Sequence, residues 1–303
     1  PVGPTRNRLG EGFIAPMLTT SHPQGYGTVL VAGAGDVGTR VARRLVAQGR
    51  QVFALRRSDA DRDHGIHWLR GDLTRPASLE GLPAVDAVVF APAPDARDEA
   101  TYRSLFVDGL RHLLNALPEA PRRTLFVSSS AVYGEHGGAW VDEATPVAPP
   151  GFNGRVLVEA ERWLAGNAVG GIAVRLAGLY GPGRTQLFDR LREGKASAPH
   201  GGRVYANRIH VDDAAAALAL LLDVDRPEPV YVGVDDTPLP IDVLYGHLAT
   251  LLGAPAPADG PPPAGIGNKR LSNARLRAAG FRCAWPDARD GYAALIGSGH
   301  AAA

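Results

Sequence analysis

The segment Thr28-Val-Leu-Val-Ala-Gly33-Ala-Gly35-Asp-Val-Gly38-Thr-Arg-Val-Ala-Arg-Arg-Leu45 decides the fold. In it a short apolar run ends in a Gly-x-Gly-x-x-Gly motif and passes directly into helical spacing, with Val37, Val41 and Leu45 on one face. This order predicts a strand, a tight turn and a helix. The motif alone is weak, because the chain contains 37 glycines, but here it has the strand and the helix that it requires.

Each glycine of the motif has its own expected role. Gly33 permits the turn, Gly35 lets a pyrophosphate approach the backbone, and Gly38 lets the helix pack closely on the strand. The start of the helix, at Asp36 and Val37, offers free N–H groups and the positive end of the helix dipole to a phosphate. The segment therefore predicts a pocket for a dinucleotide.

Apolar runs alternate with helical patterns through the first half of the chain. Strands that alternate with helices predict a parallel sheet covered by helices on both faces. We therefore expect an α/β fold, a doubly wound (Rossmann) parallel sheet of about seven strands with a small interleaved C-terminal lobe. A long helix is expected over 99–117. The expected strands are 29–32, 52–55, 66–69, 85–90, 124–127, 172–174 and 229–234.

The chain is expected to divide into three parts. Residues 1–26 form a leader outside the fold, and Met17, the only methionine, is interpreted as the natural first residue. Residues 27–176 form the dinucleotide-binding Rossmann domain. Residues 177–297 form a substrate lobe that interleaves with the last strands of the sheet.

Composition points to a small-molecule partner. Lys and Arg total 32 and Asp and Glu total 31, and the basic residues are scattered, so neither nucleic acid nor a membrane surface is an expected partner. The single cysteine, Cys283, leaves no disulfide and no zinc site, and no metal is expected. Because no apolar run approaches about 20 residues and no secretory signal precedes the first strand, the expected location is cytoplasmic.

Two arginines follow the second expected strand. An NAD-binding fold usually carries an acidic residue there, which holds a ribose hydroxyl. Arg56 and Arg57 would instead pair with a 2′-phosphate, so we expect NADP, with NAD as the other cofactor to consider. The alternative interpretation is that both guanidiniums are solvated surface groups.

Further candidates follow the third and fourth strands. Asp72 and Leu73 come after the third strand, where a carboxylate and an apolar side chain would frame an adenine. A turn or helix cap is an equally good interpretation of Asp72. Ala91 and Pro92 end the fourth strand and begin a stiff loop beside the cofactor.

The fifth strand delivers hydroxyl groups to the edge where a nicotinamide and a substrate would meet. The sequence there is Ser128-Ser129-Ser130-Ala-Val-Tyr133-Gly134. A serine cluster after a strand is also typical of a turn or a cap.

Taken together, these motifs resemble the extended short-chain dehydrogenase/reductase (NAD-dependent epimerase/dehydratase) family. The resemblance runs from Thr28 to about Ile296. It implies an NAD(P)-dependent oxidoreductase or epimerase that acts by hydride transfer on a sugar-like or other hydroxyl or carbonyl substrate. The matching segments are 33–38, 71–73, 128–134, 175–183 and 209–214.

The resemblance also implies an acid/base pair, Tyr-x-x-x-Lys, which this chain lacks. One alignment puts Asn153 and Leu157 in the two positions, and a shift of two residues gives Gly151 and Arg155. This departure resembles an atypical subset of the family without the pair. The proton-transfer machinery therefore differs from that of the family.

The family's site residues transfer to this chain as follows. Ser129 takes the position of the catalytic serine or threonine, Tyr133 lines the substrate side, and Tyr133 or Tyr180 is a candidate substitute proton donor. The expected catalytic residues are Ser129, Tyr133 and Asn153. The expected cofactor-binding residues are Gly33, Gly35, Asp36, Val37, Gly38, Arg56, Arg57, Asp72, Leu73, Ala91, Pro92, Ser128 and Arg155. The expected substrate-binding residues are Tyr180, Arg184, Asn207 and Arg208.

Several alternatives stay open from the sequence. Arg184 and Arg208 fit a structural salt bridge as well as an anionic substrate group. His210 fits a structural histidine before a helix that Asp212 or Asp213 would cap. Without Tyr-x-x-x-Lys, a non-catalytic NADP-binding sensor or scaffold is the rival to the enzyme. By analogy with the family, a homodimer is the expected assembly.

Overall fold

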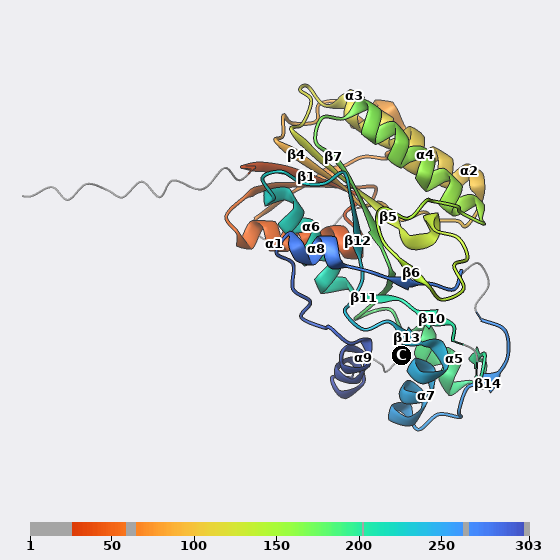
Figure 1. Ribbon diagram of the computed structural model, residues 1–303. Coiled ribbons are helices and arrows are strands. Elements are labelled where there is room, and N and C mark those ends of the chain that lie inside the picture. The colour runs from red at the N-terminus through yellow and green to blue at the C-terminus, as the bar shows by residue number, and fades with distance from the viewer. Residues whose placement is uncertain (1–25, 59–64, 202, 263–266, 300–303) are drawn as a thin grey trace, which may run out of the picture.

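The computed structural model describes residues 26–58, 65–201, 203–262 and 267–299 (Figure 1). The predictions about Met17 and about residues 1–25 of the leader lie outside these ranges. Tyr26, the last residue of the predicted leader, packs under two guanidiniums. The carbon centres of Arg122 and Arg123 lie 4.7 and 5.1 Å from its ring centre. Tyr26 therefore contacts the folded body.

A seven-stranded sheet forms the centre of the molecule, in the order β12-β7-β5-β4-β1-β2-β3. All neighbouring strands run parallel. The order reverses beside β1, because β2 follows on one side and β4 on the other, and ligands of such sheets bind at this crevice. The predicted doubly wound fold is confirmed. The strands are β1 (Thr28–Ala32), β2 (Gln51–Arg56), β3 (Ile66–Arg70), β4 (Ala87–Phe90), β5 (Arg123–Ser129), β7 (Gly171–Leu176) and β12 (Val230–Gly233).

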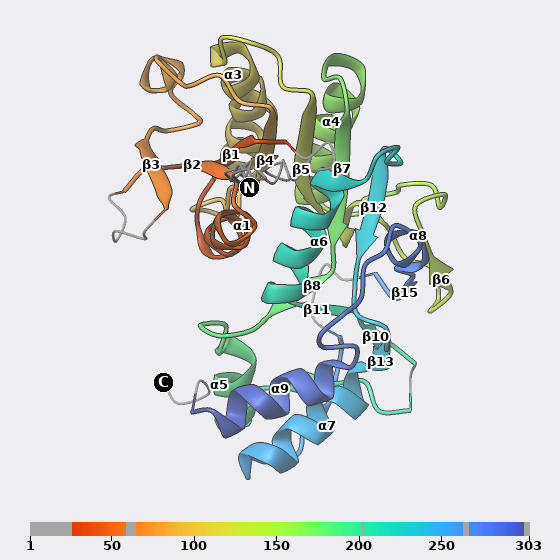
Figure 2. The same cartoon turned by 90° about the vertical axis from the view of Figure 1, so that its left-hand side faces the viewer.

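Helices cover both faces of the sheet (Figure 2). On one face α1 (Asp36–Ala47) packs against α6 (Val211–Asp223). On the other face, α4 (Phe152–Asn167) packs against a helix made of α2 (Glu99–Tyr102), η2 (Arg103–Asp108) and α3 (Gly109–Ala116). The predicted helix over 99–117 is therefore present, but its middle turn η2 is a π-helix.

Burial follows the predicted faces. Val37, Val41 and Leu45 of α1 are buried, as their helical spacing predicts. Every residue of β4 is fully buried, which is typical of a central parallel strand. None of the helices in the described ranges combines the length and apolarity needed to cross a bilayer.

A second hydrophobic cluster lies below the sheet, apart from the main core. Its helices are α5 (Gln186–Arg192), α7 (Ile241–Leu252) and α9 (Ala288–Gly297) (Figure 1). The chain enters this region after β7, returns to the sheet as β12, and then enters it again. The short elements are η1 (Pro76–Leu79), η3 (Ser130–Val132), β6 (Trp140–Val141), β8 (Gly178–Tyr180), β9 (Ser197–Ala198), β10 (Tyr205–Ala206), β11 (Arg208–His210), β13 (Leu239–Pro240), β14 (Ala258–Asp259), β15 (Arg270–Leu271) and α8 (Ala274–Ala278).

Candidate functional site

The turn between β1 and α1 needs glycine at two positions for packing reasons. Gly33 has φ +89°, and a Cβ there would lie 2.4 Å from the backbone N and Cα of Pro92. At Gly38 a Cβ would lie 2.4 Å from the carbonyl oxygen of Gly33. At Gly35 a Cβ would meet no atom within 4 Å. Gly35 therefore faces open space, where a ligand can reach the backbone.

Backbone hydrogen bonds hold this turn against β2. The N–H groups of Gly33 and Ala34 both donate to the carbonyl oxygen of Leu55, each at 3.0 Å. Helix α1 then begins at Asp36 with no side-chain cap. Because the first N–H groups of a helix have no acceptor within it, α1 offers unpaired donors at its positive end. An anion such as a pyrophosphate fits this arrangement.

A cavity of about 1040 Å³ opens beside the turn, at the carboxyl ends of β1 to β4. It is large enough for the adenosine and pyrophosphate part of a dinucleotide. Asp36, Val37 and Gly38 begin α1 next to it, and Ala91 is buried behind Pro92. The sequence-predicted residues that line it are Gly33, Gly35, Arg56, Arg57, Asp72, Leu73 and Pro92. The lining residues that the sequence analysis missed include Arg70, Asp95, Thr101, Ser104 and Leu105.

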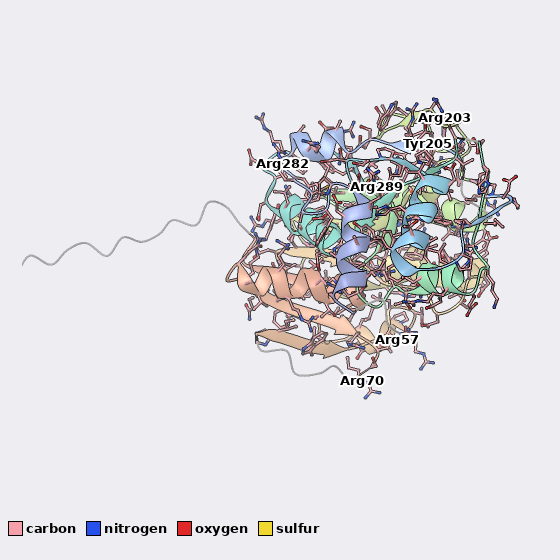
Figure 3. All side chains as sticks on the ribbon, turned by 90° about the horizontal axis from the view of Figure 1, so that it is seen from below. Arg57, Arg70, Arg203, Tyr205, Arg282 and Arg289 are labelled. Atoms are coloured by element: carbon pink, nitrogen blue, oxygen red, sulfur yellow. The ribbon has the colours of Figure 1, made fainter. Side chains whose placement is uncertain are left out.

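Both predicted arginines lie on the wall of this cavity. Arg57 projects from the same end of the sheet as Arg70 (Figure 3). Its guanidinium makes a two-pronged ion pair with Asp95, with Nη2 and Oδ1 2.6 Å apart. Arg56 donates to the Ser58 hydroxyl at 2.9 Å and lies over the ring of Trp68. Both guanidiniums therefore have protein partners that a 2′-phosphate would share or replace.

Asp72 has the turn role that the sequence left open, and it also lines the cavity. It lines the cavity, and its carboxylate accepts from the Thr74 N–H at 2.9 Å and from the Thr74 hydroxyl at 2.8 Å. Partial burial would raise the pKa of Asp72, but the two bonds from Thr74 outweigh it and hold the pKa below its ordinary value. Asp72 is therefore an ionised turn residue on the cavity wall.

Ser128 and Tyr133 belong to a buried network instead of the cavity wall. The Ser128 hydroxyl donates to Glu161 at 2.5 Å, and Arg175 pairs with the same carboxylate at 2.6 Å. Arg175 also donates to the Tyr133 hydroxyl at 2.9 Å, and that hydroxyl donates to the Asp142 carbonyl at 2.8 Å. Burial raises the pKa of Tyr133 despite the nearby guanidinium. This placement differs from the predicted roles of Ser128 at the cofactor and Tyr133 on the substrate side.

Ser129 ends β5 and Asn153 lies at the start of α4, which packs against η3. The Ser129 hydroxyl accepts from the Ala131 N–H at 3.2 Å and caps η3, in agreement with the cap interpretation of the serine cluster. Asn153 lies in the first turn of α4. At Gly154 a Cβ would lie 2.3 Å from the Ala131 carbonyl oxygen, so α4 begins directly against η3. Both polar side chains are half-buried.

Arg155 contacts two neighbouring segments at the start of α4, and its expected role at the cofactor stays a prediction. Its guanidinium lies 3.8 Å from the carboxylate of Glu99 on α2, and it is more than half exposed. The Pro150 carbonyl accepts from the same guanidinium at 3.4 Å. The contact with Glu99 ties α4 to α2, and Ala100 and Thr101 of α2 line the cavity.

The predicted substrate residue Tyr180 belongs to the second hydrophobic cluster, and Arg208 lies on the strand β11 that pairs with β8. The ring of Tyr180 is buried and stacks on Tyr292 with ring centres 4.3 Å apart. Within the described part of the chain its hydroxyl has no hydrogen-bond partner. Burial, and then the nearby Asp235, raise the pKa of Tyr180 far above its ordinary value. Arg208 donates to the Asn207 carbonyl at 3.1 Å. A proton donor at Tyr180 does not fit this burial.

Asn207 is also a structural residue. Its side-chain amide donates to the Lys269 carbonyl at 2.9 Å, and its oxygen accepts from the Leu271 N–H at 2.8 Å. Both ends of the side chain therefore bind backbone, and the expected contact between Asn207 and a substrate stays a prediction.

Arg184 reaches the glycine turn from the region after β8. Its Nε lies 3.1 Å from the carboxylate of Asp36, which also pairs with Arg40 at 2.7 Å. Arg40 in turn pairs with Asp212 at 2.5 Å. The charge of Asp36 at the start of α1 is thereby balanced by two guanidiniums, beside the N–H groups that would meet a pyrophosphate.

His210 fills the structural role that the sequence left as an alternative. Its Nδ1 accepts from the Asp212 N–H at 3.2 Å and so caps α6. Burial lowers the pKa of His210. The predicted caps Asp212 and Asp213 lie within the first turn instead, and Asp213 accepts from the Ala284 and Trp285 N–H groups at 2.9 Å each.

Known proteins share this fold and these motifs. The model of the NAD dependent epimerase/dehydratase family matches residues 29–233. The 3-diazoavenalumate denitrifying reductase of a Streptomyces species is 32% identical over 252 residues, which cover 76% of this chain and 83% of that protein. A solved structure from Methylobacillus flagellatus, assigned to the NAD-dependent epimerases/dehydratases, is 38% identical with a TM-score of 0.76, covering 90% of this chain and 98% of that one.

More distant structures share the fold alone. UDP-glucose 4-epimerase of Thermus thermophilus, solved in complex with NAD, is 21% identical with a TM-score of 0.74, covering 91% of this chain and all of that one (100%). The glycine turn, the cavity and the match to the family model together support a nicotinamide dinucleotide as the cofactor. The chain belongs to the NAD dependent epimerase/dehydratase family, within the extended short-chain dehydrogenases/reductases.

Proposed function

We propose that the protein is an NADP-dependent oxidoreductase that transfers hydride to or from a sugar-like or other small hydroxyl or carbonyl substrate. The observation that carries the proposal is the turn at Gly35, where open space meets the uncapped start of α1. Protein packing does not require glycine at position 35, because a Cβ there would meet no protein atom within 4 Å. The close approach of a ligand to the backbone would require it. When bound, the nicotinamide would supply the hydride in a reduction or accept it in an oxidation, and the protein would orient the two reactants.

The preference for NADP rests on the charge of the cavity wall. Arg56, Arg57 and Arg70 all line the end of the cavity formed by β2 and β3. A guanidinium pairs with a phosphate more strongly than with a neutral hydroxyl group. NAD remains the alternative cofactor, since acidic side chains line the same wall.

The substrate is expected near Ser129 and Asn153. The hydroxyl and the amide can each donate a hydrogen bond to a carbonyl oxygen, which would gain negative charge or a proton during reduction. Tyr133 and Tyr180 are buried, and the Tyr133 hydroxyl is bonded within the protein interior. Ser129 therefore replaces the phenol as the group that orients the reacting oxygen. Residues 177–297 would cover the substrate, and pairing of two chains stays a prediction.

Two measurements test the proposal. Purified protein is first titrated with NADPH and with NADH, and binding of neither at millimolar concentration would refute it. A panel of ketones, aldehydes and nucleotide sugars is then incubated with NADPH carrying deuterium at C4. Deuterium in a product demonstrates hydride transfer. Ser129→Ala and Asn153→Ala should each lower turnover, while Arg162→Gln, a change at an exposed position of α4, should not.

The rival function is that of a non-catalytic NADP-binding sensor or scaffold. It is favoured by the buried Tyr133 hydroxyl, whose two hydrogen bonds both serve the protein interior. Tight binding of NADPH without deuterium transfer to any compound of the panel would support it. Transfer that depends on Ser129 would exclude it.

A further inference from the structure

The carboxylate of Asp95 lies at the end of the cavity formed by β2 and β3, where Arg57 would meet a 2′-phosphate. No sequence motif predicted an acidic residue there. Asp95 lies in the loop after β4, and its ion pair joins it to Arg57, just past the end of β2. The two residues are 38 positions apart in the sequence. Both line the cavity.

The geometry of this pair leaves each partner available to a ligand. The side chains of Arg57 and Asp95 are 54% and 65% exposed, so solvent reaches both. A guanidinium carries five N–H donors, and a two-pronged ion pair uses two of them. A carboxylate likewise has acceptor positions left over. The pair is therefore an exposed contact that can be shared or exchanged at modest cost.

We propose that Arg57 and Asp95 together select the cofactor, with Arg57 binding the 2′-phosphate of NADP and Asp95 accepting from the 2′-hydroxyl of NAD. This inference rests on the proposed function, because it requires that the cavity bind a nicotinamide dinucleotide. NAD-binding folds usually carry an acidic residue at the end of the second strand, where this chain has arginines. Asp95, from the loop after β4, brings a carboxylate to the same place. The protein therefore accepts both cofactors, and Asp95 weakens its preference for NADP.

The surrounding charges single out Asp95 for this role. Among the described residues that line this wall, Asp72 is the other carboxylate, but Thr74 holds it through an N–H and a hydroxyl. Asp95 is instead held by its exposed ion pair with Arg57, which keeps the pKa of Asp95 below its ordinary value. Asp95 is thus ionised at neutral pH and repels a phosphate that approaches Arg57.

Binding of cofactors and of their adenosine halves by the variants tests the proposal. Dissociation constants for NADPH, NADH, 2′,5′-ADP and 5′-ADP are measured by calorimetry on wild type, Asp95→Asn, Arg57→Gln and the double variant. Asp189→Asn is the control, because Asp189 forms an exposed ion pair with Arg192 at 3.5 Å on α5. The calorimetric signal does not depend on turnover.

The two variants should move the ratio of affinities in opposite directions. Asp95→Asn should tighten NADPH and 2′,5′-ADP by about tenfold and weaken NADH by about threefold, because it removes a repelling charge and a hydroxyl acceptor. Arg57→Gln should weaken NADPH by about 30-fold and change NADH by less than about threefold. The control should match wild type. The shift in NADPH affinity should shrink in about 0.5 M salt, since the charges are exposed.

Three results would overturn the inference. The first is an unchanged ratio of NADPH to NADH affinity in Asp95→Asn, and the second is the same change in the control. The third is a loss of NADPH affinity in Asp95→Asn as large as that in Arg57→Gln, which would make Asp95 a positioning residue for Arg57. Failure of wild type to bind any of the four nucleotides would instead refute the proposed function itself.

Discussion

Replacing Gly35 with alanine should remove cofactor binding while leaving the fold intact. The added Cβ would meet no protein atom within 4 Å, and Gly35 has φ −81°, on the side of φ that L residues occupy. Alanine is a poorer N-cap than glycine by roughly 0.5–1 kcal/mol. The lower entropy of the unfolded chain offsets this by about 0.4–1 kcal/mol. The free energy of unfolding should therefore stay within about 1 kcal/mol of wild type.

The same methyl group occupies the space in which a pyrophosphate would approach the α1 amides. We expect the dissociation constants of NADPH and NADH to rise by at least about 30-fold, a loss near 2 kcal/mol. Gly38→Ala is the matched comparison. Its Cβ would lie 2.4 Å from the Gly33 carbonyl and 3.2 Å from a Val31 methyl, so α1 must move away from β1. Such overpacking costs about 1–3 kcal/mol and should lower the thermal midpoint.

Thermal unfolding and calorimetric titration of both variants separate the two effects. Gly35→Ala should keep the wild-type midpoint within about 4 °C. Addition of NADPH should raise the midpoint of wild type but not that of Gly35→Ala. Wild-type affinity for both cofactors in Gly35→Ala would refute the assignment of the dinucleotide to this turn. Unfolding of Gly35→Ala would refute the geometric argument.

Three further changes test buried groups. Asp235 is buried, and burial raises its pKa to about 8, so only the folded state holds this proton between about pH 4 and 8. The free energy of unfolding should therefore fall with rising pH across that range, and Asp235→Asn should flatten the slope measured by urea unfolding. Glu161→Gln should cost about 3 kcal/mol in the same assay, because Arg175 is left buried without its counterion, and an unchanged urea midpoint would contradict the pairing. Tyr133→Phe should lower the free energy of unfolding by about 1–2 kcal/mol, since it loses the bond to Asp142. It should keep the pH profile of turnover. If turnover instead no longer changed with pH on the alkaline side, Tyr133 would be the proton donor after all.

The sequence predicted what local pattern controls. The turn at Gly33 needs positive φ, and the packing of α1 needs a residue without Cβ at Gly38. Both requirements are met by glycine at fixed positions of one short motif, which can be recognised in the sequence. The strands and the buried face of α1 followed from spacing. Arg56 and Arg57 line the cavity because they lie at the end of a strand that faces the crevice, and their contact with a cofactor stays a prediction.

The sequence could not predict which way side chains turn once distant segments meet. The Tyr133 hydroxyl is occupied because Arg175, from a strand 42 residues later, reaches it in the interior. Asp95 was missed because its meeting with Arg57 depends on how the loop after β4 folds over the cavity. The only sign in the sequence was that an acidic residue, Asp95, directly follows the apolar segment that ends at Pro94. This pattern matches no known binding motif.

The return of the chain to the sheet as β12 has a practical consequence. Strand β7 pairs with β5 on one side and with β12 on the other, and more than fifty residues of intervening chain separate β7 from β12. A fragment that stops after residue 176 would expose one whole side of β7, an unprotected edge that invites association with other chains. Expression of the nucleotide-binding half should therefore extend through residue 233, and a soluble fragment is expected only then.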